Sequence, residues 1–252
     1  MAEFPVLPGA EPFSAPGGPH GALVLHGFTG CPQSMRRLAQ AFAGAGFAVE
    51  LPRLPGHGTS IEDMLETGWS DWSAHAETAY NDLAARCDKI VVAGLSMGGT
   101  LTVWLAERHP EIAGIVLVNP AIEPPAESFR EMLRGILDSG STVMPAVGND
   151  IADPDQTELA YDVTPVPCLL SLCEADDGIA AALGTIECPV LLMNSPQDHV
   201  VPPSSSDMLA SSVSGPVERV TLERSYHVAT LDYDKDDIER RAVEFANKVT
   251  AA

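Results

Sequence analysis

The chain has 252 residues, of which 45% are apolar, so it can bury one large hydrophobic core. Its 35 acidic and 14 basic side chains give a formal net charge of −21, which excludes nucleic acid as a partner because phosphate binding needs a basic surface. No apolar run reaches eighteen residues, so we expect no stable membrane insertion.

The N-terminal residues and the cysteines predict a cytoplasmic protein. Residues 1–5 contain neither a basic nor an apolar segment, unlike a secretory leader. The five cysteines are an odd number, are spread along the chain and form no C-x-x-C pair. We therefore expect reduced thiols in a cytosol and no metal site.

Strand-like and helix-like segments alternate along most of the chain. A leader rich in proline and glycine runs to Gly21 and is expected to add a short antiparallel hairpin. The segments read as strands are 22–25, 47–51, 89–93, 115–118, 189–193 and 217–222, and helical apolar spacing is found at 35–43, 72–83 and 238–249. This alternation predicts an α/β fold with a mostly parallel central sheet flanked by helices.

The segment 122–186 interrupts the alternation, because it separates two predicted strands by far more than a usual crossover. We therefore predict a core of residues 1–121 and 187–252, and a cap or lid of residues 122–186 whose apolar inner face shapes an acyl pocket. The alternative is a surface excursion with no part in catalysis. Its two apolar helical faces are Phe129, Met132, Leu133, Ile136 and Leu137, and Leu169, Leu170, Leu172 and Cys173.

The pentapeptide Gly94-Leu95-Ser96-Met97-Gly98 is the most informative motif of the chain. It lies between a predicted strand and a helical pattern, a context that favours a nucleophile at the tip of a tight strand-to-helix turn. Such a turn aims Ser96 Oγ out of the sheet, with the positive end of the following helix behind it. The same pattern also occurs in ordinary tight turns, so the assignment depends on catalytic partners.

A serine nucleophile needs a base that takes its proton and an acid that orients the base. In the chain order serine, acid, histidine, the candidates are Asp198 and His227, which each follow a predicted strand. His199 is the alternative base, but it adjoins the proposed acid and precedes the last strand. Asp232 and Asp234 are weaker candidates for the acid, because they follow His227 too closely to reach behind its ring.

Two backbone N–H groups are also needed to stabilise a tetrahedral oxyanion. One should come from Met97, the residue after the proposed nucleophile, and the other from the loop after an early strand. That loop is His26-Gly27-Phe28-Thr29-Gly30. Phe28 is the natural second donor, because Gly27 lets the backbone fold back towards the serine.

Several motifs together give the sequence a resemblance to a known family. They are HGFTG at 26–30, LPGHG at 54–58, GLSMGG at 94–99 and SYHVATLD at 225–232. In this order they resemble bacterial monoacylglycerol lipases and their carboxylesterase relatives, over nearly the whole chain. The resemblance implies the α/β-hydrolase fold, a Ser96–Asp198–His227 triad, a small cap and a preference for monoesters of glycerol. It also implies that Val147 and Glu158 face the substrate, with Glu158 contacting glycerol hydroxyls.

We therefore predict a serine hydrolase of carboxylic esters that cleaves monoacylglycerols to glycerol and free fatty acid through an acyl-serine intermediate. This chemistry needs no cofactor and no metal. The expected partner is a small ester substrate, and the protein is expected to be a monomer or a homodimer. Two alternatives stay open: a general carboxylesterase of short or medium-chain esters, with the same catalytic residues, and a non-catalytic binding protein of the same fold.

Overall fold

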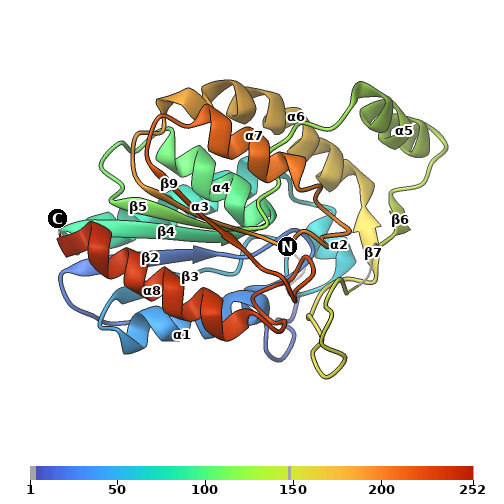
Figure 1. Ribbon diagram of the computed structural model, residues 1–252. Coiled ribbons are helices and arrows are strands. Elements are labelled where there is room, and N and C mark those ends of the chain that lie inside the picture. Colours follow the sequence, from blue (N-terminus) through green and yellow to red (C-terminus); the bar gives the residue numbers. More distant parts are fainter. Residues whose placement is uncertain (1–3, 147–148, 252) are drawn as a thin grey trace.

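The computed structural model describes residues 4–146 and 149–251 (Figure 1). Seven strands form one sheet in the order β1-β3-β2-β4-β5-β8-β9, and every neighbouring pair is parallel except β1 with β3. The mostly parallel sheet expected from the sequence is therefore observed. The strands are β1 (Phe13–Ala15), β2 (His20–Leu25), β3 (Ala48–Leu51), β4 (Lys89–Leu95), β5 (Gly114–Val118), β8 (Val190–Asn194) and β9 (Val217–Thr221), with β6 (Val143–Pro145) and β7 (Val163–Pro165) forming a separate antiparallel pair.

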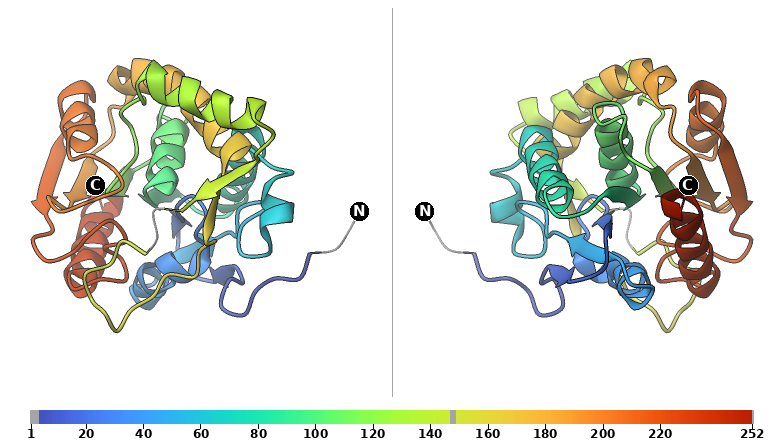
Figure 2. Two further views of the ribbon diagram at one scale, coloured as in Figure 1. Left: turned by 90° about the vertical axis from the view of Figure 1, so that its right-hand side faces the viewer. Right: turned by 90° about the vertical axis from the view of Figure 1, so that its left-hand side faces the viewer.

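Helices cover both faces of the sheet (Figures 1 and 2). Side chains of a strand alternate between the two faces, so Leu23 and Leu25 belong to the core cluster on one face of the sheet, whereas Ala22 and Val24 belong to the cluster on the other face. Apolar residues at strand spacing and at helical spacing thus meet in two core layers. The helices are η1 (Pro32–Met35), α1 (Arg36–Gly44), α2 (Ile61–Met64), α3 (Trp69–Ala84), α4 (Met97–Ala106), α5 (Glu127–Asp138), α6 (Val166–Ala182), η2 (Leu183–Thr185), α7 (Ser204–Ser212) and α8 (Lys235–Ala251).

The N-terminal leader does not form the expected hairpin. β1 pairs antiparallel with β3, with Phe13 opposite Leu51, rather than with β2, the strand that follows it. Both edges of β2 are already paired, with β3 on one side and β4 on the other. The outer edge of β3 is therefore the position at which a short antiparallel strand can join the sheet.

The segment 122–186 contains α5, α6 and the β6–β7 pair. The apolar face of α5 packs against α6, where Leu133 and Cys173 belong to one small cluster. Another side of α6 packs on the main core, to which it contributes Leu172 and Ile179. The two apolar faces read from the sequence are therefore used to join the helices to each other and to the core.

The cysteines all carry free thiols. Burial raises the pKa of Cys31, Cys168 and Cys188 to about 11 and that of Cys173 to about 12, so none of these four is an activated thiolate at neutral pH.

Among residues 4–146 and 149–251, no His, Cys, Asp or Glu side chains group in a way that could hold a metal ion. In the same residues, no helix combines the length and the apolar character needed to cross a bilayer.

Candidate active site

Ser96 lies in the sharp turn between β4 and α4. Its backbone has φ of 55° and ψ of −120°, which is a strained conformation for a residue with a side chain. The turn needs glycine on both sides: a Cβ on Gly94 would lie 2.0 Å from Gly98 O, and one on Gly98 would lie 2.2 Å from Leu25 O. The pentapeptide thus forms the strained turn that its pattern predicts, with Ser96 at the N-terminus of α4.

Asp198 and His227 form a hydrogen-bonded pair at the carboxyl ends of β8 and β9. His227 Nδ1 lies 2.7 Å from Asp198 Oδ2, and the two side chains are 9% and 2% exposed. Asp198 Oδ1 accepts hydrogen bonds from the N–H groups of Val200 and Val201, both at 2.8 Å, so the carboxylate is itself oriented. Asp232 instead accepts from several backbone N–H groups, and among the hydrogen bonds of the described residues none joins it to the His227 ring.

One cavity of about 240 Å³ brings together residues from distant parts of the chain. Ser96 and His227 both line it, and so do Phe28 and Glu158. In the part of the chain that the structure describes, no hydrogen bond joins Ser96 Oγ to the His227 ring. Such a bond is often long in the free enzyme and shortens when substrate binds.

The loop after β2 lies directly beside Ser96. A Cβ on Gly27 would lie 3.4 Å from Ser96 Cβ, so the loop backbone contacts the serine. Within the described residues, neither the Phe28 N–H nor the Met97 N–H donates a hydrogen bond to the protein. Met97 is the first residue of α4, and such N–H groups have no partner inside the helix. Both predicted oxyanion donors are therefore unpaired in this arrangement.

His26 joins this loop to the turn at 54–58. Its Nε2 accepts a hydrogen bond from the Leu54 N–H at 3.1 Å, which leaves Nδ1 to donate to Gly27 O at 3.0 Å. Burial holds the pKa of His26 well below its usual range and lowers that of His57 to about 4. Both rings are thus neutral, and their hydrogen bonds to backbone groups stabilise the two loops.

Asn119, at the end of β5, connects the Asp198 and His227 loops. Its Nδ2 donates to Ser195 Oγ at 3.1 Å and to His227 O at 2.8 Å, while its Oδ1 accepts from the Ser195 N–H at 2.7 Å. The residue is 2% exposed. Sequence reasoning missed this role, and the one available signal was a polar side chain at the carboxyl end of a central strand.

Asp150 connects the segment 122–186 to the His227 loop. Its Oδ2 accepts from the N–H groups of His227 and His199, both at 3.0 Å, and its Oδ1 lies 2.7 Å from His199 Nδ1. The alternative base His199 therefore contacts Asp150 rather than Asp198, and its side chain is 59% exposed. Asp150 lies 77 residues before His227, so no local motif could have indicated the contact.

Glu158 lies in the cavity beside the loop after β2. A Cβ on Gly30 would come within 2.6 Å of Glu158 Oε1, and the Glu158 N–H donates to Asn149 Oδ1 at 2.6 Å. Burial raises the pKa of Glu158, and the nearby His227 offsets part of this shift. Val147, the other predicted substrate contact, lies outside the described residues.

The insertion reaches the cavity through the segment between α5 and α6, not through those helices. Of its described residues, Ala146, Asp150, Tyr161 and Thr164 are among those that line the cavity, and no residue of α5 or α6 is. The expectation that the apolar helical faces shape an acyl pocket is therefore wrong for these helices. Their apolar side chains are already buried against each other and against the core.

Comparison with known proteins agrees with this geometry. Residues 19–234 match the family described as serine aminopeptidase, S33. The chain belongs to this family. It is 49% identical over 249 residues to the thermostable monoacylglycerol lipase of Bacillus sp. (strain H-257), with 98% of each protein covered. It is 26% identical over 241 residues to a carboxylesterase of Bacillus subtilis (strain 168), with 95% of this chain and 97% of that protein covered.

Solved structures of lipolytic enzymes superpose closely on this chain. One, from work on the metagenome-derived lipolytic enzymes LipS and LipT, has a TM-score of 0.92 at 43% identity and covers 97% of this chain and 100% of that one. The monoacylglycerol lipase of Paleococcus ferrophilus has a TM-score of 0.78 at 19% identity, covering 94% of this chain and 97% of that one, and so shows the fold alone. The α/β-hydrolase fold expected from the sequence is confirmed, as is the resemblance to the monoacylglycerol lipase and carboxylesterase group.

Proposed function

We propose that this protein hydrolyses carboxylic esters, with Ser96 as nucleophile, His227 as general base and Asp198 as the acid that orients it. One observation carries the proposal. A serine in a strained turn at a helix N-terminus shares a cavity with a histidine whose Nδ1 is 2.7 Å from a buried carboxylate. This arrangement supplies a nucleophile, a proton acceptor and an orienting acid.

The reaction is a two-step acyl transfer. His227 Nε2 accepts the Ser96 proton as Oγ attacks the ester carbonyl, and Asp198 stabilises the imidazolium that forms. The N–H groups of Phe28 and Met97 donate to the oxyanion of the tetrahedral intermediate, and each such donor is worth about 3–4 kcal/mol in the transition state. His227 then protonates the departing alcohol. Water, activated by the same histidine, hydrolyses the acyl-serine and releases the acid.

The proposed substrates are monoacylglycerols. The name of the 49% identical relative supports this choice. So does the cavity, which combines apolar side chains such as Phe28 and Val228 with the carboxyl group of Glu158. In this proposal Glu158 accepts hydrogen bonds from glycerol hydroxyls, Val147 contacts the substrate, and residues 122–186 act as the cap.

A general carboxylesterase of short or medium-chain esters is the second candidate. The cavity of about 240 Å³ favours it, because this volume is below the ~300 Å³ at which pockets for drug-sized ligands begin. Relative kcat/KM values for 1-monolauroylglycerol, a triglyceride and p-nitrophenyl acetate separate the two. A monoacylglycerol lipase prefers the first substrate, whereas a general carboxylesterase prefers the third.

Replacement of Ser96 by alanine tests the catalytic proposal. We expect kcat on p-nitrophenyl butyrate to fall at least about a thousandfold, because subtilisin-type serine knock-outs lose even more. A fluorophosphonate probe should label the wild type and fail to label this variant. Ser211→Ala, which changes an exposed serine in α7, is the matched control and should keep full activity and labelling. Activity of the Ser96 variant close to that of the wild type, with an intact fold, would refute the proposal.

Asp150 has a positioning role in this proposal. Its carboxylate accepts from the His227 backbone and from His199, and so holds the His227 loop against the cap.

The cytoplasmic location and the monomeric or homodimeric state stay predictions from the sequence.

A further inference from the structure

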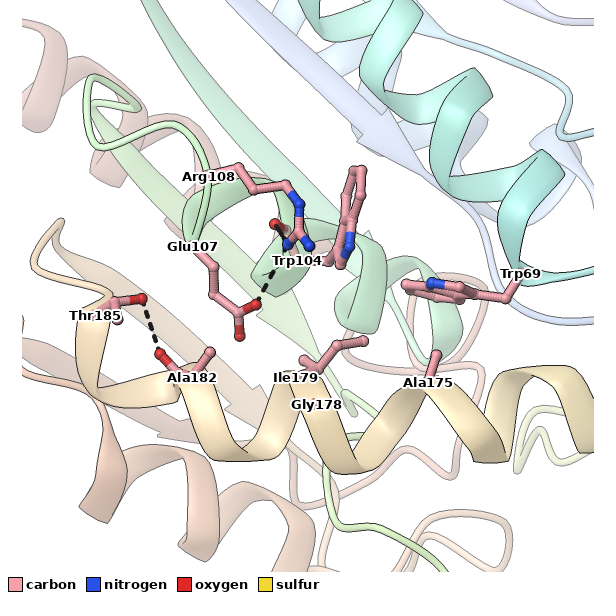
Figure 3. Close-up of a pocket in the computed structure, with 9 residues that line it drawn as sticks. All are labelled: Trp69, Trp104, Glu107, Arg108, Ala175, Gly178, Ile179, Ala182 and Thr185. Carbon is pink, nitrogen blue, oxygen red and sulfur yellow. Dashed lines mark hydrogen bonds and ion pairs between the residues drawn. The ribbon is translucent and has the colours of Figure 1, made fainter.

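A second cavity, of about 600 Å³, lies between α4 and α6 (Figure 3). Its walls include Trp104 of α4, Glu107 directly after the end of α4, Gly178 from the C-terminal half of α6 and Trp69 from the start of α3. Glu107 follows Ser96 by eleven residues at a rise of 1.5 Å each, so the two lie about 16 Å apart along the helix axis. We call this cavity the α4–α6 groove, and it is separate from the candidate active site.

Glu107 is the unusual residue of the α4–α6 groove. Its side chain is only 6% exposed, and its Oε2 lies 3.6 Å from Arg108 Nη1. Its Oε1 is buried and has no hydrogen-bond partner within the described part of the chain. Figure 3 shows the carboxylate pointing from α4 towards α6. Buried charges are normally paired, and this carboxylate has only the Arg108 contact at 3.6 Å, so a cation in the groove would stabilise its ionised form.

Two tryptophans provide the apolar walls. The rings of Trp69 and Trp104 meet edge to face, with centroids 6.3 Å apart. The Arg108 guanidinium lies 4.1 Å from the centre of the Trp104 ring and stacks on it, which shows that this indole already attracts a cation. The net charge of −21 adds a long-range field that also favours cations over anions.

Gly178 keeps the floor of the groove open. It lies in the interior of α6, where glycine is less favourable than alanine. A Cβ at this position would meet no atom within 4 Å, and the residue does not have a positive φ. Helix geometry and packing therefore do not require glycine here, and its effect is the space it leaves between α6 and α4.

We propose that the α4–α6 groove binds a small organic cation, a primary ammonium group on an aromatic or alkyl body. The ammonium pairs with the carboxylate of Glu107, which lines the groove, and the apolar body packs against Trp69, Trp104 and Ile179. Arg108 lies at the rim with its side chain 47% exposed, where solvent weakens its repulsion of the ligand. An anionic ligand would instead meet the buried carboxylate. This site is independent of the ester hydrolysis proposed above.

Isothermal titration with 2-phenylethylammonium chloride tests this proposal. We expect saturable binding of one ligand per chain at pH 8, at least tenfold tighter than binding of the neutral analogue 2-phenylethanol. Glu107→Gln, which removes the charge at constant shape, and Gly178→Leu, which fills the groove, should each weaken binding at least tenfold. Both should keep wild-type esterase activity and a cooperative thermal unfolding transition, and Ser96→Ala should bind like the wild type.

The pH dependence provides a second measurement. Burial raises the pKa of Glu107 to about 7, and Arg108 is the other charged residue of the groove, since α3 and α6 line it with uncharged side chains. Affinity should therefore fall at least tenfold from pH 8 to pH 5.5 in the wild type and stay constant in Glu107→Gln. No saturable binding to the wild type, or equal binding to either groove variant, would overturn the proposal.

Discussion

Replacing Asp150 by alanine is expected to lower kcat with a much smaller change in KM. The carboxylate accepts hydrogen bonds from the backbone N–H groups of His227 and His199, both at 3.0 Å, and lies 2.7 Å from His199 Nδ1. Alanine removes these contacts together. The His227 ring then keeps its bond to Asp198, but its backbone loses the acceptor that fixes the loop relative to Ser96.

The expected size follows from the contact that His227 loses. A hydrogen bond to a charged group contributes about 1.5–3 kcal/mol. Each ~1.4 kcal/mol of lost transition-state stabilisation lowers the rate tenfold, so kcat should fall about ten- to hundredfold. The His199 pair contributes little, because its imidazole is 59% exposed and exposed ion pairs are worth about 0–1 kcal/mol.

Steady-state kinetics on p-nitrophenyl butyrate, with thermal unfolding of each variant, measure the effect. Asp150→Asn keeps an oxygen acceptor for the His227 N–H and should recover most of kcat. His199→Ala leaves that hydrogen bond in place and should change kcat less than about threefold. Wild-type kcat in Asp150→Ala, or an equal loss in His199→Ala, would refute the positioning role. So would a loss of kcat that Asp150→Asn fails to restore although it folds normally.

Three further changes test other parts of the molecule. Glu158→Gln should raise KM for 1-monolauroylglycerol several-fold and leave KM for p-nitrophenyl butyrate nearly unchanged, because glycerol hydroxyls are the proposed partners of the carboxyl group; equal effects on both substrates would contradict this. Gly98→Ala should lower the free energy of unfolding in urea by about 3 kcal/mol or more, because its Cβ would lie 2.2 Å from Leu25 O. Gly135→Ala in α5, which has open space around its Cβ, should instead raise the free energy of unfolding by about 0.5–1 kcal/mol. Burial raises the pKa of Asp176 from 3.8 to about 7, so the protein loses stability as the pH rises from about 4 to 7. Asp176→Asn should remove this loss, which is at most about 4 kcal/mol. Identical urea unfolding curves for the variant and the wild type at pH 8 would contradict this prediction.

Much of the fold was predictable because its signals are local. Apolar runs such as Lys89–Leu95 are buried on both sides of the sheet, and residues such as Ile238, Ala242 and Phe245 repeat at helical spacing on the buried face of α8. Strand pairing is less local. The leader was expected to form a hairpin, yet β1 pairs with β3, because both edges of β2 are already paired.

The segment 122–186 also shows that local sequence signals do not determine which elements pack together. Its helical faces were correctly read as apolar and in need of a partner. Periodicity alone does not say which partner, and α5 and α6 cover each other and the core, while the loop between them reaches the cavity. Which part of the segment lines the cavity is therefore decided by packing between elements, which sequence periodicity does not report.

By itself the amino-acid sequence determined the strained turn at Ser96, because the glycines at 94 and 98 and the flanking strand and helix are contiguous in the chain. It also determined that an acid and a histidine follow successive strands of one parallel sheet, whose carboxyl ends meet at one edge. Only the tertiary structure decided that Asn119 and Asp150 hold those loops. Their hydrogen bonds to His227 span 108 and 77 residues, and a contact between groups so far apart depends on the packing of the whole sheet and leaves no periodic or motif signal in the sequence.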